Sequence, residues 1–170
     1  PKNVTLKLNL AVTLPSIEAD SGQLQQIVMN LITNAAEAIG DEAGEVTLST
    51  GVARYDADDL RANRTNEPVD SGDFAYVEVA DTGCGMAEET RARLFDPFFT
   101  TKFTGRGLGM SAVLGIVRGH RGAIVVDSEP GTGSRIRVLF PVSREAVRSR
   151  AAAPAPPAAS PARRLRILVV

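Results

Sequence analysis

The chain has 170 residues, of which 44% are apolar, and its 19 Lys plus Arg against 20 Asp plus Glu leave a formal net charge of -1. This composition suits one domain with a buried core, and the balanced charge offers no basic field for nucleic acid, so no nucleic-acid partner is expected. One Cys and one His exclude an internal disulfide and a zinc site, and no apolar run approaches the roughly 20 residues that span a bilayer. We expect a cytoplasmic fragment, with membrane attachment of a parent protein lying outside these residues.

Composition divides the chain into three parts. Residues 1–145 carry the pattern of a folded domain. Residues 146–162 contain the Ala/Pro-rich run AAAPAPPAASP, which cannot bury a face and is predicted to be a linker. Residues 163–170, RRLRILVV, look like the start of a further buried strand.

The first two predicted elements are a strand and a long helix. Thr5–Leu10 alternates polar and apolar residues, which predicts a half-buried strand with its leucines on one face. Asp20 is placed to cap a helix that Gly40 ends in a left-handed conformation. The apolar residues of this helix share one face, and a polar set is assigned to the opposite face: Gln23, Gln26, Asn30, Asn34 and Glu37.

The rest of the domain adds four strands and two helices. Strands are predicted at 46–52, 76–80, 123–128 and 134–140, and helices at 87–94 and 111–118. The polar stretch 53–73 is too long for a tight hairpin and is treated as a surface insertion without an assigned role. Adjacent strands without intervening helices favour an α+β fold, a two-layer sandwich whose mixed, mostly antiparallel sheet carries helices on one face.

Three features could carry chemistry. Asn30 and Asn34 lie one turn apart, and amide oxygens are hard ligands suited to Mg²⁺. Asp81 ends a strand and is followed by Gly-x-Gly, so its carboxylate could accept a hydrogen bond from a flat ligand. Gly105–Ser111 is glycine-rich and leads into a helix, where main-chain amides can hold an anion. Each feature alone is also compatible with an exposed helix, an ordinary turn or a hinge.

Two common nucleotide motifs do not fit these glycines. The Walker loop needs Gly-Lys-Ser/Thr, and the chain has no Gly-Lys pair. A Rossmann fingerprint needs glycines between a strand and a helix of a βαβ unit with an acid about 20 residues on, which neither glycine set provides.

Together, the features resemble the ATP-binding catalytic domain of bacterial sensor histidine kinases, in the gyrase-like ATPase superfamily. The family's sequence boxes occur in order across about residues 5–141 as NLITNAAEAI, DTGCGM, FDPFFTTK, GRGLGMS and GTGSRIRVLFP. The resemblance implies a Bergerat-type fold that binds ATP and Mg²⁺.

The same resemblance implies the residues of the ATP site, with Asn34 as the metal ligand, Asn30 assisting near the phosphates and Asp81 reading the adenine amine. The implied nucleotide-binding residues are Asn30, Asn34, Asp81, Gly83, Gly85, Met86, Lys102, Arg106, Gly107, Leu108, Gly109 and Ser134. Residues 86–105 would form a mobile lid, in which Phe95, Phe98 and Phe99 are either apolar anchors or plain core residues. Arg106, Ser134 and Ile136 depart from the family's usual Thr, Thr and Phe.

The resemblance also separates a kinase from a hydrolase. Related ATPases carry a glutamate, the general base for water, at the position of Asn30, and an amide cannot take that proton. We therefore expect transfer of the γ-phosphoryl group to a histidine on a separate helical dimerisation domain. His120, the only histidine, is expected to be a surface residue at a helix end, so this fragment lacks the acceptor.

One further partner and two alternatives complete these expectations. The tail is similar to the first strand of a receiver domain, which suggests a hybrid kinase and a phosphorelay, and the fragment itself is expected to be monomeric. The alternatives are a gyrase-type ATPase that drives a conformational clamp and a nucleotide-binding module that no longer catalyses.

Overall fold

The computed structural model describes residues 3–101 and 106–143. The predictions for Lys102, for the domain boundary at 145, for the linker and for the strand-like tail lie outside these residues.

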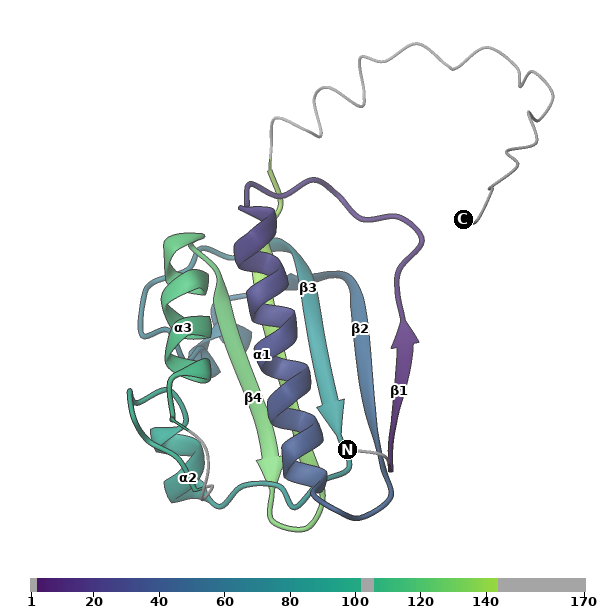
Figure 1. Ribbon diagram of the computed structural model, residues 1–170. Coiled ribbons are helices and arrows are strands. Elements are labelled where there is room, and N and C mark those ends of the chain that lie inside the picture. The colour runs from purple at the N-terminus through teal and green to yellow at the C-terminus, as the bar shows by residue number, and fades with distance from the viewer. Residues whose placement is uncertain (1–2, 102–105, 144–170) are drawn as a thin grey trace, which may run out of the picture.

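A five-stranded mixed sheet forms one layer of the fold, and α1 and α3 lie on one of its faces (Figure 1). The strand order is β1-β2-β3-β5-β4; β1 runs parallel to β2 and the other pairs are antiparallel. The elements are β1 (Val4–Asn9), α1 (Ser21–Ile39), β2 (Gly44–Tyr55), the 3-10 helix η1 (Asp59–Ala62), β3 (Gly72–Asp81), α2 (Glu88–Arg93), α3 (Gly109–Gly119), β4 (Ala123–Glu129) and β5 (Gly133–Pro141). The predicted α+β sandwich is confirmed.

Both predicted caps of α1 are present. Asp20 Oδ1 accepts a hydrogen bond from the Gln23 main-chain N–H at 2.8 Å, which satisfies a donor that the first helical turn leaves free. Gly40 ends the helix and its N–H donates to the Ala36 carbonyl at 3.3 Å, but with a φ of 69° and a ψ of -133° it has a conformation open to glycine that lies outside the predicted left-handed helical region. These caps fix the ends of the helix, and the position of each of its side chains along the sheet follows from them.

The main core lies between the sheet and the two long helices. Buried side chains of α1 and α3 pack there on the inward-facing residues of β2 to β5, and Phe95 joins them from the segment after α2. Its members include Ile27, Leu31, Ala35, Ile39, Val46, Val79, Val113, Val117, Ile124, Val138 and Phe140. At about 25 cal/mol per Å² of apolar surface removed from water, this layer supplies most of the free energy that stabilises the fold.

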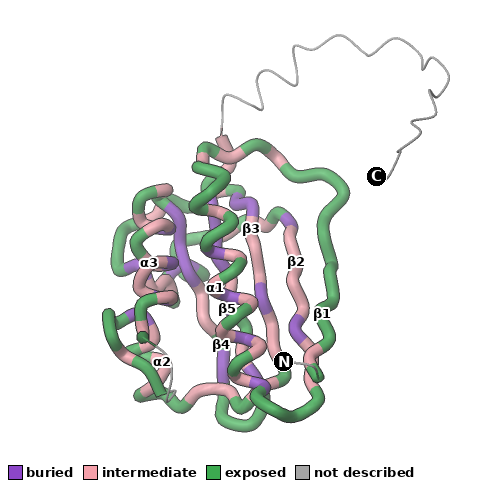
Figure 2. Tube along the Cα trace, in the orientation of Figure 1, coloured by how far each residue is buried: buried purple, intermediate pink, exposed green. Residues whose placement is uncertain are grey.

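The predicted half-burial of the first strand is wrong. Leu6 and Leu8 lie in register with Val46 and Leu48, on the face of the sheet that the helices cover, yet they are 49% and 60% exposed. The reason is position, because β1 is an edge strand beyond the reach of α1, and Figure 2 shows it exposed along most of its length.

The insertion between β2 and β3 covers the opposite face of the sheet at one end. Leu60 of η1 packs there with Phe74, Ala123 and Leu139 in a second, smaller buried cluster. The segment then follows the edge of β4, where the Arg64 N–H donates to the Ile124 carbonyl at 2.9 Å. The insertion is therefore a structural part of the domain that covers an open edge strand.

Candidate functional site

The two asparagines lie beside the buried face of α1 instead of opposite to it. Both are half-buried, and a Cβ placed on Gly109 at the start of α3 would lie 3.2 Å from Asn30 Oδ1. The assignment to the opposite face is wrong because a turn of about 100° per residue puts Asn30 and Asn34 on the flank that faces α3. The fold thus brings the asparagine helix and the second glycine-rich segment together.

Asp81 closes a turn at the end of β3. Its Oδ1 accepts a hydrogen bond from the Gly83 N–H at 2.8 Å, and the side chain is half-buried. A Cβ on Gly83 would lie 2.6 Å from the Ala38 carbonyl carbon and oxygen, and the Cys84 N–H donates to that oxygen at 3.0 Å. The first glycine box is therefore held against the last turn of α1, one helical turn beyond Asn34.

Gly85 and Gly133 permit close contact between the first glycine box and the β4–β5 hairpin. Gly85 has a φ of 66°, and a Cβ there would lie 1.9 Å from the Glu129 carbonyl oxygen. A Cβ on Gly133, whose φ is 88°, would lie 2.0 Å from the Asp81 carbonyl oxygen. Side chains are excluded at both positions by backbone atoms that cannot swing away.

A serine pair connects these elements further. The Met86 N–H donates to Ser128 Oγ at 2.9 Å, and Ser128 Oγ lies 3.0 Å from Ser134 Oγ. Ser134 stands directly opposite Asp81 in the β3–β5 register. Ser128 is not among the predicted site residues, and only its place at the end of a strand could have indicated it.

The second glycine box connects the lid segment to α3. Gly107 has a φ of 66° and accepts a hydrogen bond at its carbonyl from the Phe98 N–H at 3.0 Å. Leu108, the N-cap residue, makes no side-chain cap, and the first N–H groups of a helix have no acceptor within the helix itself. Arg106 and Leu108 are exposed.

The three phenylalanines of the lid segment have different surroundings. Phe95 is buried in the main core, as an anchor would be. The Phe99 ring lies under the Arg93 guanidinium, 4.2 Å from its carbon to the ring centroid. Phe98 is 76% exposed with a φ of 65°, so it anchors nothing among the described residues.

His120 connects the start of α1 to the end of α3. Its Nε2 accepts a hydrogen bond from the Asp20 N–H at 3.2 Å, and its Nδ1 lies 2.8 Å from the Ile116 carbonyl oxygen. The ring is half-buried and packs edge-on against Phe140. The expected surface residue is therefore a structural one, at the ends of the two helices that lie away from the asparagines and the glycine boxes.

Two negative findings apply to the residues that the structure describes. Among them, no group of three or more His, Cys, Asp or Glu side chains is placed to hold a metal ion. None of the helices in that part of the chain has the length and apolar character needed to cross a membrane.

Comparison with known sequences places this chain in a family. Residues 19–144 match the family described as histidine kinase-, DNA gyrase B-, and HSP90-like ATPase. The chain is 37% identical over 143 residues to the sensor kinase CckA of Brucella abortus, with 82% of this chain and 15% of that protein covered. It is 41% identical over 133 residues to the sensory histidine kinase/phosphatase NtrB of Rhizobium meliloti, with 78% and 34% covered.

Solved structures give the same result. The chain resembles full-length ShkA in complex with AMPPNP with a TM-score of 0.63 and 31% identity, covering 84% of this chain and 26% of that one. It resembles the catalytic domain of the histidine kinase ThkA with a TM-score of 0.62 and 26% identity, covering 84% and 82%. The curated relatives quoted above are several times longer than the segment that this chain spans. The chain belongs to the family of histidine kinase-, DNA gyrase B- and HSP90-like ATPases, and its relatives within that family are sensor histidine kinases.

Proposed function

We propose that this domain binds Mg²⁺-ATP and donates the γ-phosphoryl group to a histidine on a separate helical dimerisation domain. The observation that carries the proposal is the proximity of Asn30 to the start of α3, where a Cβ on Gly109 would lie 3.2 Å from Asn30 Oδ1. It places an amide-bearing helix flank beside a helix N-terminus whose N-cap residue, Leu108, makes no side-chain cap. Such N–H groups and the helix dipole favour phosphate oxygens.

The adenine end of the nucleotide would lie at Asp81. One carboxylate oxygen accepts from the Gly83 N–H, which orients the group, and a carboxylate has several lone pairs that suit an exocyclic amine. Gly83 and Gly85 keep side chains out of this region, and Met86 and Ser134 are tied to it through Ser128. The similar ShkA structure is a complex with the ATP analogue AMPPNP, which supports nucleotide binding by this domain.

The residues present suit a magnesium ion. Mg²⁺ bound to nucleotide phosphates needs only one or two protein oxygens, and the half-buried Asn34 amide is a hard donor of this kind. When bound, the ion would neutralise phosphate charge. Asn34 would hold it and Asn30 would lie near the phosphates, while Gly107 and Gly109 would offer main-chain N–H groups. Arg106 is an exposed cation that precedes Gly107 in the chain and would contact phosphate. Lys102 is proposed as a further phosphate contact from the sequence alone.

Transfer to histidine is favoured over hydrolysis by the side chain at position 30. An asparagine amide cannot accept a proton from attacking water, so the γ-phosphoryl group would be kept for an external nucleophile. His120 does not serve as that nucleophile, because both of its ring nitrogens are engaged by main-chain groups. The acceptor must therefore come from another domain.

The remaining partners are also proposals. A receiver domain, fused after the linker or separate, would take the phosphoryl group in a cytoplasmic phosphorelay. The fragment without dimerisation helices would be a monomer.

The decisive experiment incubates the 170-residue chain with γ-labelled ATP and Mg²⁺, with and without a helical histidine domain from a similar kinase. We expect label on that domain's histidine and little phosphate release without it. Repeated turnover without the acceptor would instead identify an ATPase, and binding without either reaction a non-catalytic module. His120→Gln removes the imidazole but keeps a donor and an acceptor at this position, so it serves as a control and should transfer label as the unaltered chain does.

Asp81→Asn tests the adenine assignment. Asparagine keeps the Oδ1 that accepts from the Gly83 N–H but replaces the second oxygen with an amide, so the turn survives while the adenine contact does not. We expect ATP affinity by calorimetry to fall about tenfold or more. Unchanged affinity would remove Asp81 from the site.

Asn34→Asp tests the metal assignment. The added negative charge should alter magnesium-dependent nucleotide binding much more than binding in the presence of a chelator. Equal effects under the two conditions would show that Asn34 does not hold the ion.

A further inference from the structure

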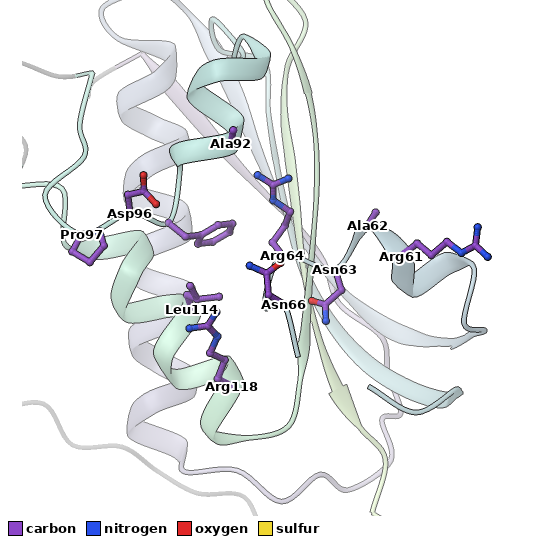
Figure 3. A pocket seen from close by; sticks show the side chains of 11 residues that line it. Arg61, Ala62, Asn63, Arg64, Asn66, Ala92, Asp96, Pro97, Leu114 and Arg118 are labelled. Carbon is purple, nitrogen blue, oxygen red and sulfur yellow. The ribbon is translucent and has the colours of Figure 1, made fainter. Parts of the chain in front are cut away.

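A cavity of about 620 Å³ lies between the insertion, the segment after α2 and the outer flank of α3 (Figure 3). Its volume falls within the range of roughly 300–1,000 Å³ typical of small-molecule sites. Arg61, Arg64 and Arg118 line it together with a single acid, Asp96. The wall of the cavity therefore carries a net positive charge.

Arg64 is oriented in this cavity but not neutralised. Its main-chain N–H is fixed to the Ile124 carbonyl of β4, and its Nη2 donates to the Arg91 carbonyl at 2.6 Å. A guanidinium has five N–H donors, so most of them stay available to a ligand. Among the described residues no carboxylate forms an ion pair with this side chain, and a carbonyl oxygen does not cancel a full charge.

Arg118 is held in a similar way from the other side. Its Nε and Nη2 donate to the Thr65 carbonyl at 2.9 and 2.6 Å. Thr65 is fully buried, so this acceptor is a fixed part of the insertion. The Glu67 carboxylate lies 3.8 Å from Arg118 Nε, beyond hydrogen-bond distance, on a side chain that is half exposed. An exposed partner of this kind compensates the charge only weakly.

The other charged groups of the wall contribute less to an anion site. Asp96 lies 3.6 Å from Arg93 on exposed side chains, so this pairing, like that of Arg118, compensates charge only weakly. Arg61 lies 3.0 Å from Asp58 and points away from the other lining residues in Figure 3. The wall keeps an excess of positive charge, and Arg64 and Arg118 are the two lining arginines that main-chain carbonyls hold in place. Phe95 and Leu114 add apolar surface to the lining.

This cavity is distinct from the nucleotide site. Leu114 and Arg118 lie on the flank of α3 that faces the insertion, whereas Gly109 faces Asn30 of α1. The buried residues of α3, Met110, Val113 and Val117, separate the two flanks. A ligand in one site would not occupy the other.

We propose that this cavity is a second binding site, for a small organic anion with a phosphate or carboxylate group on a compact apolar body. The oxyanion would bind Arg64 and Arg118, whose planar forks suit the oxygens of phosphate and carboxylate, and the body would lie on Phe95 and Leu114. The ligand is different from the nucleotide of the proposed catalytic site.

The test titrates the 170-residue chain with phenyl phosphate, benzoate and inorganic phosphate, followed by calorimetry and by amide chemical shifts. Phenyl phosphate should bind most tightly, because it combines about -1.5 to -2 charges with a ring, and it should shift amides of the insertion, of α2 and of the second half of α3. Saturating ADP should not displace it.

Variants locate the site. Arg64→Gln and Arg118→Gln should each weaken phenyl phosphate binding about tenfold or more, whereas Arg54→Gln, which removes one exposed charge elsewhere, should have no effect. Ala92→Phe places a ring at the exposed edge of the cavity without removing a charge, and it should weaken phenyl phosphate binding even if an arginine variant fails to fold. The proposal is overturned if phenyl phosphate does not bind, if ADP displaces it, or if Ala92→Phe binds it as the unaltered chain does.

Discussion

At the scale of single residues, the glycines of this domain differ in what a side chain would meet. Gly85 has a φ of 66°, and a Cβ there would lie only 1.9 Å from a backbone oxygen, whereas Gly40 has a φ of 69° and nothing within 4 Å. Gly115 lies inside α3 in open space. Glycine is thus required at Gly85 by the close approach of another backbone segment, and it is favoured at Gly40 by a positive φ. At Gly115 neither reason applies.

These differences predict the effect of alanine at each position. Gly85→Ala should destabilise the fold by roughly 2–5 kcal/mol, because strain at positive φ adds to a clash with backbone. Gly40→Ala should cost about 1–2 kcal/mol from the conformation alone, and Gly115→Ala should stabilise by about 0.5–1 kcal/mol. Urea unfolding of the three variants measures these values. Equal losses of stability in Gly85→Ala and Gly40→Ala would contradict the close approach of the Glu129 carbonyl to Gly85.

The glycine boxes also show what residue patterns can reveal. Their spacing indicates a nucleotide site, but the pattern does not show that Gly85 faces the Glu129 carbonyl or that Ser128 connects Met86 to Ser134. Gly85 and Met86 contact the β4–β5 hairpin, which is distant in the sequence, so the local sequence pattern does not predict these contacts.

At the scale of elements, the two faces of the sheet are covered by different means. Helices cover one face, and the insertion covers one end of the other through Leu60. On that outer face Arg137 joins Glu78, Tyr55 and the Tyr76 ring. Burial lowers the pKa of Arg137, but hydrogen bonds from its guanidinium to Tyr55 and Glu78 outweigh this and leave the pKa above its ordinary value. Arg137 therefore stays charged and holds three strands together.

Leu60→Ala tests the insertion as a structural element. Removing this buried side chain leaves a cavity over Phe74 and Leu139, and we expect a loss of about 2–5 kcal/mol in urea unfolding. Leu8→Ala, at an exposed leucine of β1, is the matched control and should change stability by less than about 0.5 kcal/mol. Similar losses in both variants would mean that β1 is covered in solution.

Acid should loosen the attachment of β1. Lys7 Nζ lies 2.5 Å from Glu45 Oε2 on the neighbouring strand, and the hydrogen bond from Lys7 is the largest influence that lowers the pKa of Glu45 below its ordinary 4.5. A pKa that is lower in the folded state stabilises fully above pH 4.5, and this contribution is lost as the pH falls through the folded value.

The measurement is urea unfolding between about pH 6 and about pH 3 for the unaltered chain and for Glu45→Gln. The variant should be slightly less stable at the upper pH, and the difference should vanish in acid. A difference that persists at the lower pH would exclude the Lys7–Glu45 pair as its cause.

At the scale of the whole molecule, the described strands and both buried clusters lie within residues 4–141. The sheet brings β1 and β5, far apart in sequence, into one layer, and the Ser143 N–H donates to the Ser16 carbonyl at 3.0 Å near the end of the described chain. The core of the described residues is therefore formed by the predicted domain.

Deletion of residues 146–170 should accordingly leave thermal stability and ATP affinity unchanged. Differential scanning fluorimetry and calorimetry on the shortened chain check this, with the unaltered chain measured in parallel. A marked fall in melting temperature would show that the Ala/Pro-rich region or the tail packs on the domain, against the prediction of a linker.

Periodicity, helix caps and glycine spacing are local properties, so they suffice to predict the elements, the fold class and the boxes of the nucleotide site. Three features needed the packed molecule: the flank of α1 that carries Asn30 toward α3, the exposure of Leu6 and Leu8, and the cover that the insertion gives to the edge of β4. Each of these depends on which distant segment lies alongside. Local sequence determines which secondary structure a residue adopts and therefore which way its side chain points from the backbone. Which residues the side chain contacts depends on how elements far apart in the sequence pack together.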